Sequence, residues 1–203
     1  SSRGPAADGR IKPDLAAVGT NVYSTIDGHT YGFKTGTSMA APGVAGFFTV
    51  LHNAHDELQG DTATGGLLKA IAMNTADDLG NNGPDFIFGY GRVNARRAIK
   101  TIRDTAWFTN SITTGDTLTY DINVPNGARE LRAMLYWTDK EGSTFASKAL
   151  VNNLDFTVTD LTGSTTYQPW VLNPTPNNVT LNNLAVRTTD TLNNAEQVTL
   201  DAP

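Results

Sequence analysis

The stretch that most constrains the fold of this chain is GTSMAAPGVAGF, residues 36–47. Small and apolar side chains fill nearly every position, which predicts a helix buried on all sides. Gly43 and Gly46 each weaken a helix by about 1 kcal/mol, so their presence predicts close packing against a neighbouring element. Pro42 is tolerated only near the first turn of a helix. We therefore expect the helix to begin just before Pro42, with Ser38 at its N-terminus.

Ser38 has two interpretations that its local surroundings leave open. The first is a helix N-cap, the commonest role for a serine at such a place. The second is a catalytic nucleophile, which needs a base to take its proton and donors to hold the oxyanion formed on attack. A helix N-terminus supplies such donors, because its first backbone N–H groups have no partner within the helix. Gly36, Ala40 and Ala41 leave room for a substrate carbonyl.

The composition narrows the classes of partner. The chain of 203 residues has a formal net charge of −5 and no cysteine. Nucleic-acid binding needs a basic surface, so we expect no nucleic-acid partner. No run approaches the ~18 consecutive apolar residues of a membrane helix, so we expect no membrane span. Without disulfides, stability must come from packing, with bound cations as a further source.

The chain divides into two halves with different patterns. Residues 1–103 mix strand and helix signals typical of an α/β domain, with a strand expected at 20–26 and helices at 38–53, 66–76 and 93–102. Residues 104–203 instead place apolar side chains at alternate positions, in strands expected at 117–124, 130–137 and 154–160. Such strands, separated by turns, predict an antiparallel β-sandwich. The expected fold class is α/β, followed by an all-β antiparallel sandwich.

Three segments of the first half carry a resemblance to a known family. GTSMAAP resembles the nucleophile motif of the subtilisin-like serine proteases, the subtilase family. SSRGP followed by GRIKPDLAAVG (9–19) resembles the stretch before that motif, and FGYGRVNARRAI (88–99) resembles the closing segment of the catalytic domain. The resemblance implies that residues 1–103 form the C-terminal portion of such a domain.

The second half resembles the jelly-roll-like module that follows the catalytic domain in a bacterial branch of the family. The resemblance lies in LVNNLDFTVTD (150–160) and NNAEQVTLDAP (193–203). It implies a jelly-roll-like β-sandwich over residues 104–203, which we expect to lack its last strand. It also implies a secreted or cell-surface protein that acts on peptides or proteins.

The family resemblance assigns roles to four residues at the start of the expected helix. It implies that Ser38 is the acylating nucleophile and that Thr37 and Ser38 contribute to oxyanion binding. It further implies that Gly36 and Met39 contact the substrate. The chemistry of the family requires no cofactor.

The other catalytic residues implied by the family are absent from this sequence. The family's Asp, His and oxyanion Asn lie upstream of the serine, and no matching motif is present here. His29 lies near a turn, where a surface role outweighs a role as base. His52 and His55 follow Ser38 by roughly 20 Å of helix, beyond hydrogen-bond reach. We therefore expect the missing N-terminal part of the catalytic domain to supply these groups, and this chain alone to be inactive.

Two further sets of residues suggest other roles. Asp14 resembles a family position near a weak cation site, although a loop cap explains it as well. Separately, Asn152, Asn153 and Asp155 offer oxygen ligands suited to structural Ca²⁺, although a hydrogen-bonded turn explains them as well. Trp107, Trp137 and Trp170 raise the alternative of an exposed sugar-binding set. For the whole chain, the alternative to a protease is a non-catalytic binding or adhesion β-sandwich module, attached to a vestigial protease segment. Trp137 lies on the apolar face of its expected strand, which favours core packing.

Overall fold

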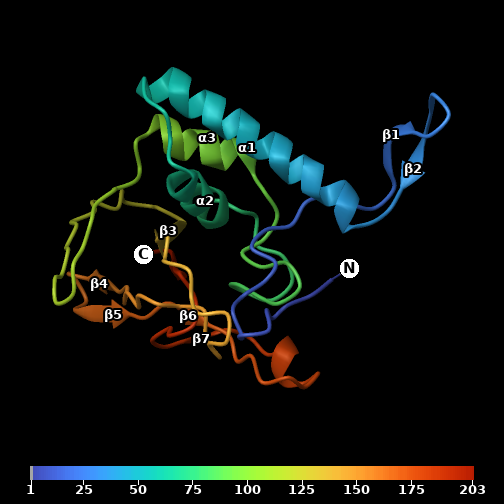
Figure 1. Ribbon diagram of the computed structural model, residues 1–203. Coiled ribbons are helices and arrows are strands. Elements are labelled where there is room, and N and C mark those ends of the chain that lie inside the picture. The colour runs from blue at the N-terminus through green and yellow to red at the C-terminus, as the bar shows by residue number, and fades with distance from the viewer. Residues whose placement is uncertain (1) are drawn as a thin grey trace.

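The computed structural model of the chain describes residues 2–203. A helical layer and a set of small sheets pack against each other, and a hairpin projects from the start of the longest helix (Figure 1). The helices are α1 (Thr37–Gln59), α2 (Gly65–Asn74), α3 (Ala95–Arg103) and the 3₁₀ turn η1 (Thr180–Asn182). The strands are β1 (Val22–Ile26), β2 (Thr30–Lys34), β3 (Glu130–Tyr136), β4 (Val158–Asp160), β5 (Thr165–Tyr167), β6 (Trp170–Val171), β7 (Val186–Arg187) and β8 (Ala195–Asp201).

Helix α1 begins at Thr37, with Gly36 as a backbone N-cap that makes no side-chain capping bond. It ends at Gly60, which adopts a left-handed conformation (φ 78°) and donates its N–H to the carbonyl of Asp56 at 3.1 Å. Glycine is suited to this C-terminal position because it has no Cβ to clash. Pro42 was expected in the first turn of the helix because proline lacks a backbone N–H, but it lies about one turn further inside.

The prediction that α1 is buried on all sides is wrong for the described residues. Only Phe47, Leu51 and His55 are buried. A Cβ added at Gly46 would meet nothing within 4 Å. The reason is that α1 packs on α3 and α2 along one side only (Figure 1), so apolar residues on its other side, such as Ala41, Ala45 and Val50, are exposed.

The two shorter helices match the predicted positions, and side-chain caps explain where they begin. The Thr64 hydroxyl accepts from the N–H of Leu67 at 3.2 Å, at the start of α2. The Asn94 side chain accepts from the N–H of Arg97 at 3.0 Å, at the start of α3. Both are preferred N-cap residues. The apolar faces of α2 and α3 pack with α1 in one core cluster, which contains Leu51, Leu68, Ile71, Ala98 and Ile102.

The second half contains three two-stranded antiparallel sheets within the described residues: β3–β8, β4–β5 and β6–β7. The strand expected at 130–137 is confirmed as β3, which pairs with β8. Only the end of the segment at 154–160 forms a strand, and the segment at 117–124 forms none, so that prediction is wrong. Alternating side chains define two faces, but a strand also needs a paired neighbour. The complete sandwich stays a prediction.

The two halves share a core. A second cluster joins Ile11, Met73, Phe86 and Tyr90 of the first half to Leu172, Ala185 and Ala195 of the second. Hydrogen bonds reinforce this contact, since Tyr90 Oη donates to the carbonyl of Ala195 at 3.2 Å. The expected boundary after residue 103 lies at the end of α3 and stays a prediction. No helix within residues 2–203 is long and apolar enough to cross a membrane.

Candidate active site at the start of α1

Ser38 is the second residue of α1 and is exposed. It is not the N-cap, because that position belongs to Gly36. The interpretation of Ser38 as a simple helix cap therefore does not describe this structure. Its hydroxyl lies at the positive end of the longest helix in the chain, open to solvent.

Among the described residues, the backbone N–H groups of Thr37 and Ser38 are the two free donors at the start of α1. The N–H of Met39 is used by the carbonyl of Gly36 at 3.0 Å. The N–H groups of Thr37 and Ser38 have no hydrogen-bond partner in the part of the chain that the structure describes. Unpaired N–H groups and the helix dipole both favour negative charge at this place. Such an arrangement is chemically suited to an oxyanion, and the oxyanion roles of Thr37 and Ser38 stay a prediction.

A close crossing of two loops fixes the approach to α1. The N–H of Gly36 donates to the carbonyl of Gly19 at 2.8 Å. A Cβ at Gly19 would lie 2.6 Å from the carbonyl oxygen of Gly36, closer than real side chains approach. The N–H of Asn21 also donates to the Thr35 hydroxyl at 2.9 Å. Sequence reasoning missed these positioning contacts, and the only available signal was a glycine ahead of a strand.

Gly36 and Met39, the predicted substrate contacts, lie beside Ser38. A Cβ at Gly36 would lie 3.8 Å from Met39 Sδ, an ordinary contact distance. Both residues are half-buried. Their contact with substrate stays a prediction.

None of the three histidines contacts Ser38 within residues 2–203. His29 is exposed and sits with positive φ in the turn between β1 and β2, at the far end of the projecting hairpin (Figure 1). His52 faces Asp56 at 3.3 Å. His55 is buried, with Nδ1 3.1 Å from the carbonyl oxygen of Asp61 and its ring against Trp107. No histidine of the described residues is therefore placed to act as a base for Ser38.

The structure does not bring the suggested calcium ligands together. Asp14 lies 2.7 Å from Lys12 and 3.2 Å from Lys69. Burial pushes the pKa of Asp14 up, but the hydrogen bond from Lys12 and the charge of Lys69 outweigh it and hold the pKa below its ordinary value. Asp155 accepts only from Asn153 Nδ2, at 3.3 Å. No group of three acidic, histidine or cysteine residues in 2–203 is placed to hold a metal ion.

Asn152 instead belongs to a hydrogen-bonded turn. Its Nδ2 donates to Asp139 Oδ1 at 2.7 Å, and its carbonyl accepts from Trp137 Nε1 at 3.0 Å. Trp107 packs against the helical core, and Trp170 donates to the Thr199 hydroxyl at 2.8 Å. The indole groups are thus engaged within the protein, and no observation favours the sugar-binding alternative.

Glu196 is a buried acid that sequence reasoning missed. Its side chain is 1% exposed. Oε2 accepts from the N–H of Phe156 at 2.8 Å, and Oε1 has no partner within the described residues. Burial raises the pKa of Glu196 to about 8, and the negative charges of Asp190 and Asp155 add to this effect. The available signal was the alternation of β8, which places Glu196 on the same face as the buried Val198.

The first half of the chain is similar to known proteins. Residues 1–91 match the model of the subtilase family. The "Minor extracellular protease Vpr" of Bacillus subtilis is 40% identical over 111 residues, which cover 49% of this chain and 13% of that protein. The "C5a peptidase" of Streptococcus pyogenes is 35% identical over 106 residues, which cover 48% of this chain and 9% of that protein.

Among solved structures, the CspB protease of Clostridium perfringens is 33% identical, with a TM-score of 0.43 over 47% of this chain and 21% of that one. The chain thus spans 13% and 9% of the two curated relatives named above. The match over residues 1–91 contains Ser38 and the loops that position it.

Proposed function

We propose that Ser38 is the acylating nucleophile of a subtilisin-like serine endopeptidase. The observation that carries this proposal is the exposed hydroxyl of Ser38 beside the unpartnered N–H groups at the start of α1. The subtilase match over residues 1–91 supports it. Three described histidines without contact to Ser38 support a base that comes from outside residues 1–203.

The reaction follows from this geometry. Ser38 Oγ attacks the carbonyl carbon of a peptide bond while its proton passes to the base. The negative charge that develops on the carbonyl oxygen is held by N–H groups at the start of α1. The C–N bond then breaks, and the departing amine takes the proton from the base. Water then attacks the resulting ester while its proton passes to the base. The bond between the acyl carbon and Ser38 Oγ breaks, the base returns the proton to Ser38 Oγ, and the acid is released.

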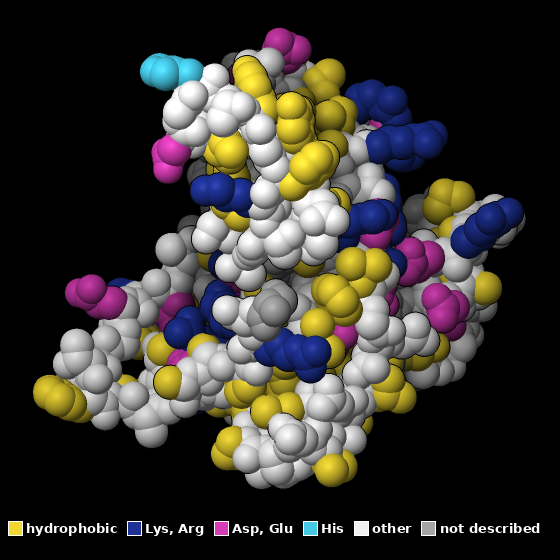
Figure 2. Space-filling view, turned by 90° about the vertical axis from the view of Figure 1, so that its right-hand side faces the viewer, with side chains coloured by type: hydrophobic (Ala, Val, Ile, Leu, Met, Phe, Trp, Pro, Cys, Tyr) yellow, Lys and Arg dark blue, Asp and Glu magenta, His cyan; other side chains and the backbone are white. Residues whose placement is uncertain are grey.

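The uncovered surfaces near Ser38 support a larger catalytic domain. Apolar residues on the open side of α1 include Ala41, Ala45 and Val50, all exposed. Figure 2 looks onto the side that carries the hairpin and the start of α1, and hydrophobic side chains are grouped at the surface there. Such patches mark surfaces that pack against other protein. A further part of the domain that covers α1 is the natural site for the Asp, His and Asn.

Residues 1–203 alone are therefore proposed to be close to inert. When a triad member is lost, only about 10³–10⁴-fold acceleration over water remains, and it depends on an intact oxyanion hole. The proposed oxyanion Asn is also outside this chain. The relatives' printed names, which include an extracellular protease, support the further proposal that the whole protein is secreted or at the cell surface and acts on peptides or proteins.

A fluorophosphonate probe tests the assignment of Ser38. The full-length protein is expected to become labelled, with the added mass on the peptide that contains Ser38. The Ser38→Ala variant and residues 1–203 alone should show little or no label. Ser24, an exposed serine on β1, provides a matched control, because Ser24→Ala should label like the wild type. Labelling elsewhere, or none in folded full-length protein, contradicts the proposal.

A further inference from the structure

The outer edge of β3 carries unpaired backbone groups. The N–H of Ala202 donates to the carbonyl of Arg129 at 2.9 Å, and the N–H of Trp137 donates to that of Asn194 at 3.2 Å. Because bonded pairs alternate in an antiparallel ladder, the odd-numbered residues of β3 bond to β8 and the even-numbered ones point away. Among these even-numbered residues, the carbonyl of Arg132 accepts from Asn74 Nδ2 at 3.1 Å, whereas the amide groups of Met134 and Tyr136 have no hydrogen-bond partner within residues 2–203.

A second row of unpaired backbone groups lies in the segment just before β3. Residues 106–124, here called the arm, reverse direction at a turn in which the N–H of Asp116 donates to the carbonyl of Thr113 at 3.0 Å. The arm loops away from the helices (Figure 1). Its second limb, residues 117–124, makes no backbone hydrogen bond within the described chain. Buried or not, such groups are strong binding elements for another strand.

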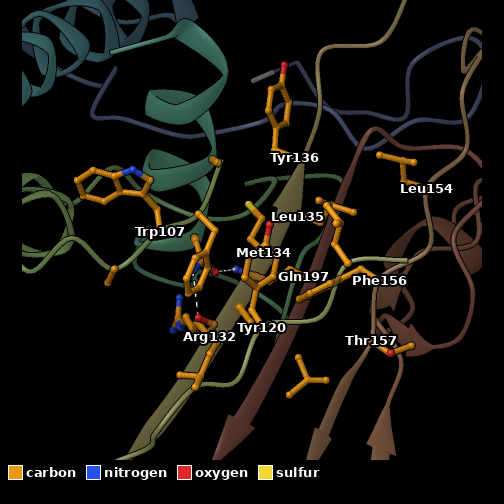
Figure 3. Close-up of a pocket in the computed structure, with 18 of the residues that line it drawn as sticks. Trp107, Tyr120, Arg132, Met134, Leu135, Tyr136, Leu154, Phe156, Thr157 and Gln197 are labelled. Atoms are coloured by element: carbon orange, nitrogen blue, oxygen red, sulfur yellow. Dashed lines mark hydrogen bonds between the residues drawn. The ribbon is translucent and has the colours of Figure 1, made fainter. Parts of the chain in front are cut away.

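The second limb of the arm also exposes an apolar stripe. Leu118, Tyr120 and Ile122 are 44%, 41% and 56% exposed. The arm borders a groove of about 3030 Å³ whose lining includes β3. In Figure 3, β3 crosses this space between Trp107 on one side and Leu154 and Phe156 on the other. The apolar stripe and the groove along β3 thus lie next to each other without being closed together.

We propose that the arm closes onto β3, with residues 117–124 adding a third strand to the β3–β8 sheet. The short connection between residues 117–124 and β3 favours pairing of these two segments over pairing of either one with a segment distant in sequence. Residues 125–130 join the two segments through a turn in which the N–H of Ala128 donates to the carbonyl of Pro125 at 3.1 Å. Gly127 supplies the positive φ of 78° that such turns require. The limb therefore already runs antiparallel to β3 along the chain.

Two features agree on which residues of β3 share a face with the apolar stripe, and we place Ile122 opposite Ala133 among the registers that they allow. Met134 and Tyr136 pack toward the shared core, so Ala133 and Leu135 face the opposite side of the sheet. Residues directly opposite each other share a face, so the apolar stripe aligns when Ile122 lies opposite Ala133. In this register Asp121 lies opposite Met134, whose free amide groups point toward it. A shift by one residue would turn the stripe to the wrong face.

Disulfide trapping in the full-length protein tests the closure, because residues 1–203 contain no cysteine of their own. The pair Ile122→Cys with Ala133→Cys should form an intrachain disulfide in monomeric protein, located by mass spectrometry of the joined peptides. The control pair, Asp121→Cys with Ala133→Cys, places the thiols on opposite faces. It should cross-link at least about tenfold more slowly, because disulfides tolerate only short Cβ separations.

Equal cross-linking of the two pairs, or none in either, overturns the closure. A disulfide-linked dimer from the first pair also overturns it, because the arm would then add to a second copy. Hydrogen exchange gives a second measure without cysteines. The amides of Met134 and Tyr136 should exchange at least about tenfold more slowly than in the Asp121→Pro variant, which cannot donate to β3. Equal exchange rates in the two proteins contradict the proposal.

Discussion

Asn193 Oδ1 accepts a hydrogen bond from the backbone N–H of Ile11 at 2.8 Å, across 182 positions of sequence. Both residues are buried. Asn193 is itself held by Asp190, because its Nδ2 donates to Asp190 Oδ2 at 2.7 Å. The segment before β8 therefore fastens the second half of the chain to the stretch that leads into the candidate active site.

Replacing Asn193 by Ala should lower the free energy of unfolding by about 1–3 kcal/mol, because a buried N–H of Ile11 loses its acceptor. Denaturant unfolding measures the change. Asn126→Ala, at an exposed turn, serves as control and should stay within about 0.5 kcal/mol of wild type. Equal effects of the two substitutions would show that this contact does not fasten the halves.

The buried Glu196 predicts a pH dependence of stability. Its folded pKa of about 8 lies above the ordinary 4.5, so the folded state binds the proton more tightly than the unfolded state. Its contribution is fully present below pH ~4.5 and is lost as pH rises toward ~8. Glu196→Gln keeps an acceptor for the N–H of Phe156 and removes the charge. The variant should therefore lose less stability than wild type between pH 5 and pH 8, approximately.

Unfolding curves across that range check the sign. Wild type and Glu196→Gln should differ most at the alkaline end, where the variant is the more stable protein. Identical slopes against pH would mean that Glu196 is not the group that titrates.

Gly19→Ala should disturb the loop that precedes Ser38. A methyl group 2.6 Å from the Gly36 carbonyl must displace that backbone. Small misplacements of catalytic groups reduce rates by up to about 10²-fold, so kcat/KM of the full-length protein should fall at least about tenfold. Gly65→Ala, where a Cβ meets nothing within 4 Å, is the matched control and should retain activity. Full activity in Gly19→Ala would show that the close contact between Gly19 and Gly36 is not needed for catalysis.

The histidines of this chain are expected to be dispensable for chemistry. Loss of a general base lowers rates by about 10²–10⁴-fold. His29→Ala and His52→Ala should each stay within about twofold of wild-type kcat, since neither touches Ser38. His55→Ala should destabilise the fold by about 1–3 kcal/mol through its lost buried contacts, yet keep kcat at permissive temperature. A loss of a hundredfold in kcat for any of them, roughly the lower bound for a base, would place the base inside this chain.

Local signals in the sequence predicted the elements whose causes are local. The apolar spacing within residues 66–76 located α2, and residues 93–102 were expected as the helix that the structure shows as α3; the caps at Thr64 and Asn94 explain where both begin. The position of Ser38 at the start of α1 also followed from its neighbours in sequence. The loop crossing of Gly19 and Gly36 could not be predicted, because nothing in either segment indicates that they meet.

The second half shows where pattern alone fails. Residues 117–124 alternate as regularly as β3, but only β3 is paired, because pairing depends on a partner distant in sequence. Alternation along β8 places Glu196 on the same face as Val198, but a charged side chain is a weak candidate for burial; its carboxylate accepts from the N–H of Phe156. The uncovered side of α1 likewise reflects which neighbours are present, not the composition of the helix.

Hydrolysis of a peptide substrate by the full-length protein and its Ser38→Ala variant tests the central claim most directly, with Ser24→Ala measured beside them. The assignment of Ser38 as nucleophile predicts that Ser38→Ala loses at least about 10³-fold in kcat while Ser24→Ala matches wild type. If folded Ser38→Ala keeps more than about a tenth of the wild-type rate, Ser38 is not the nucleophile.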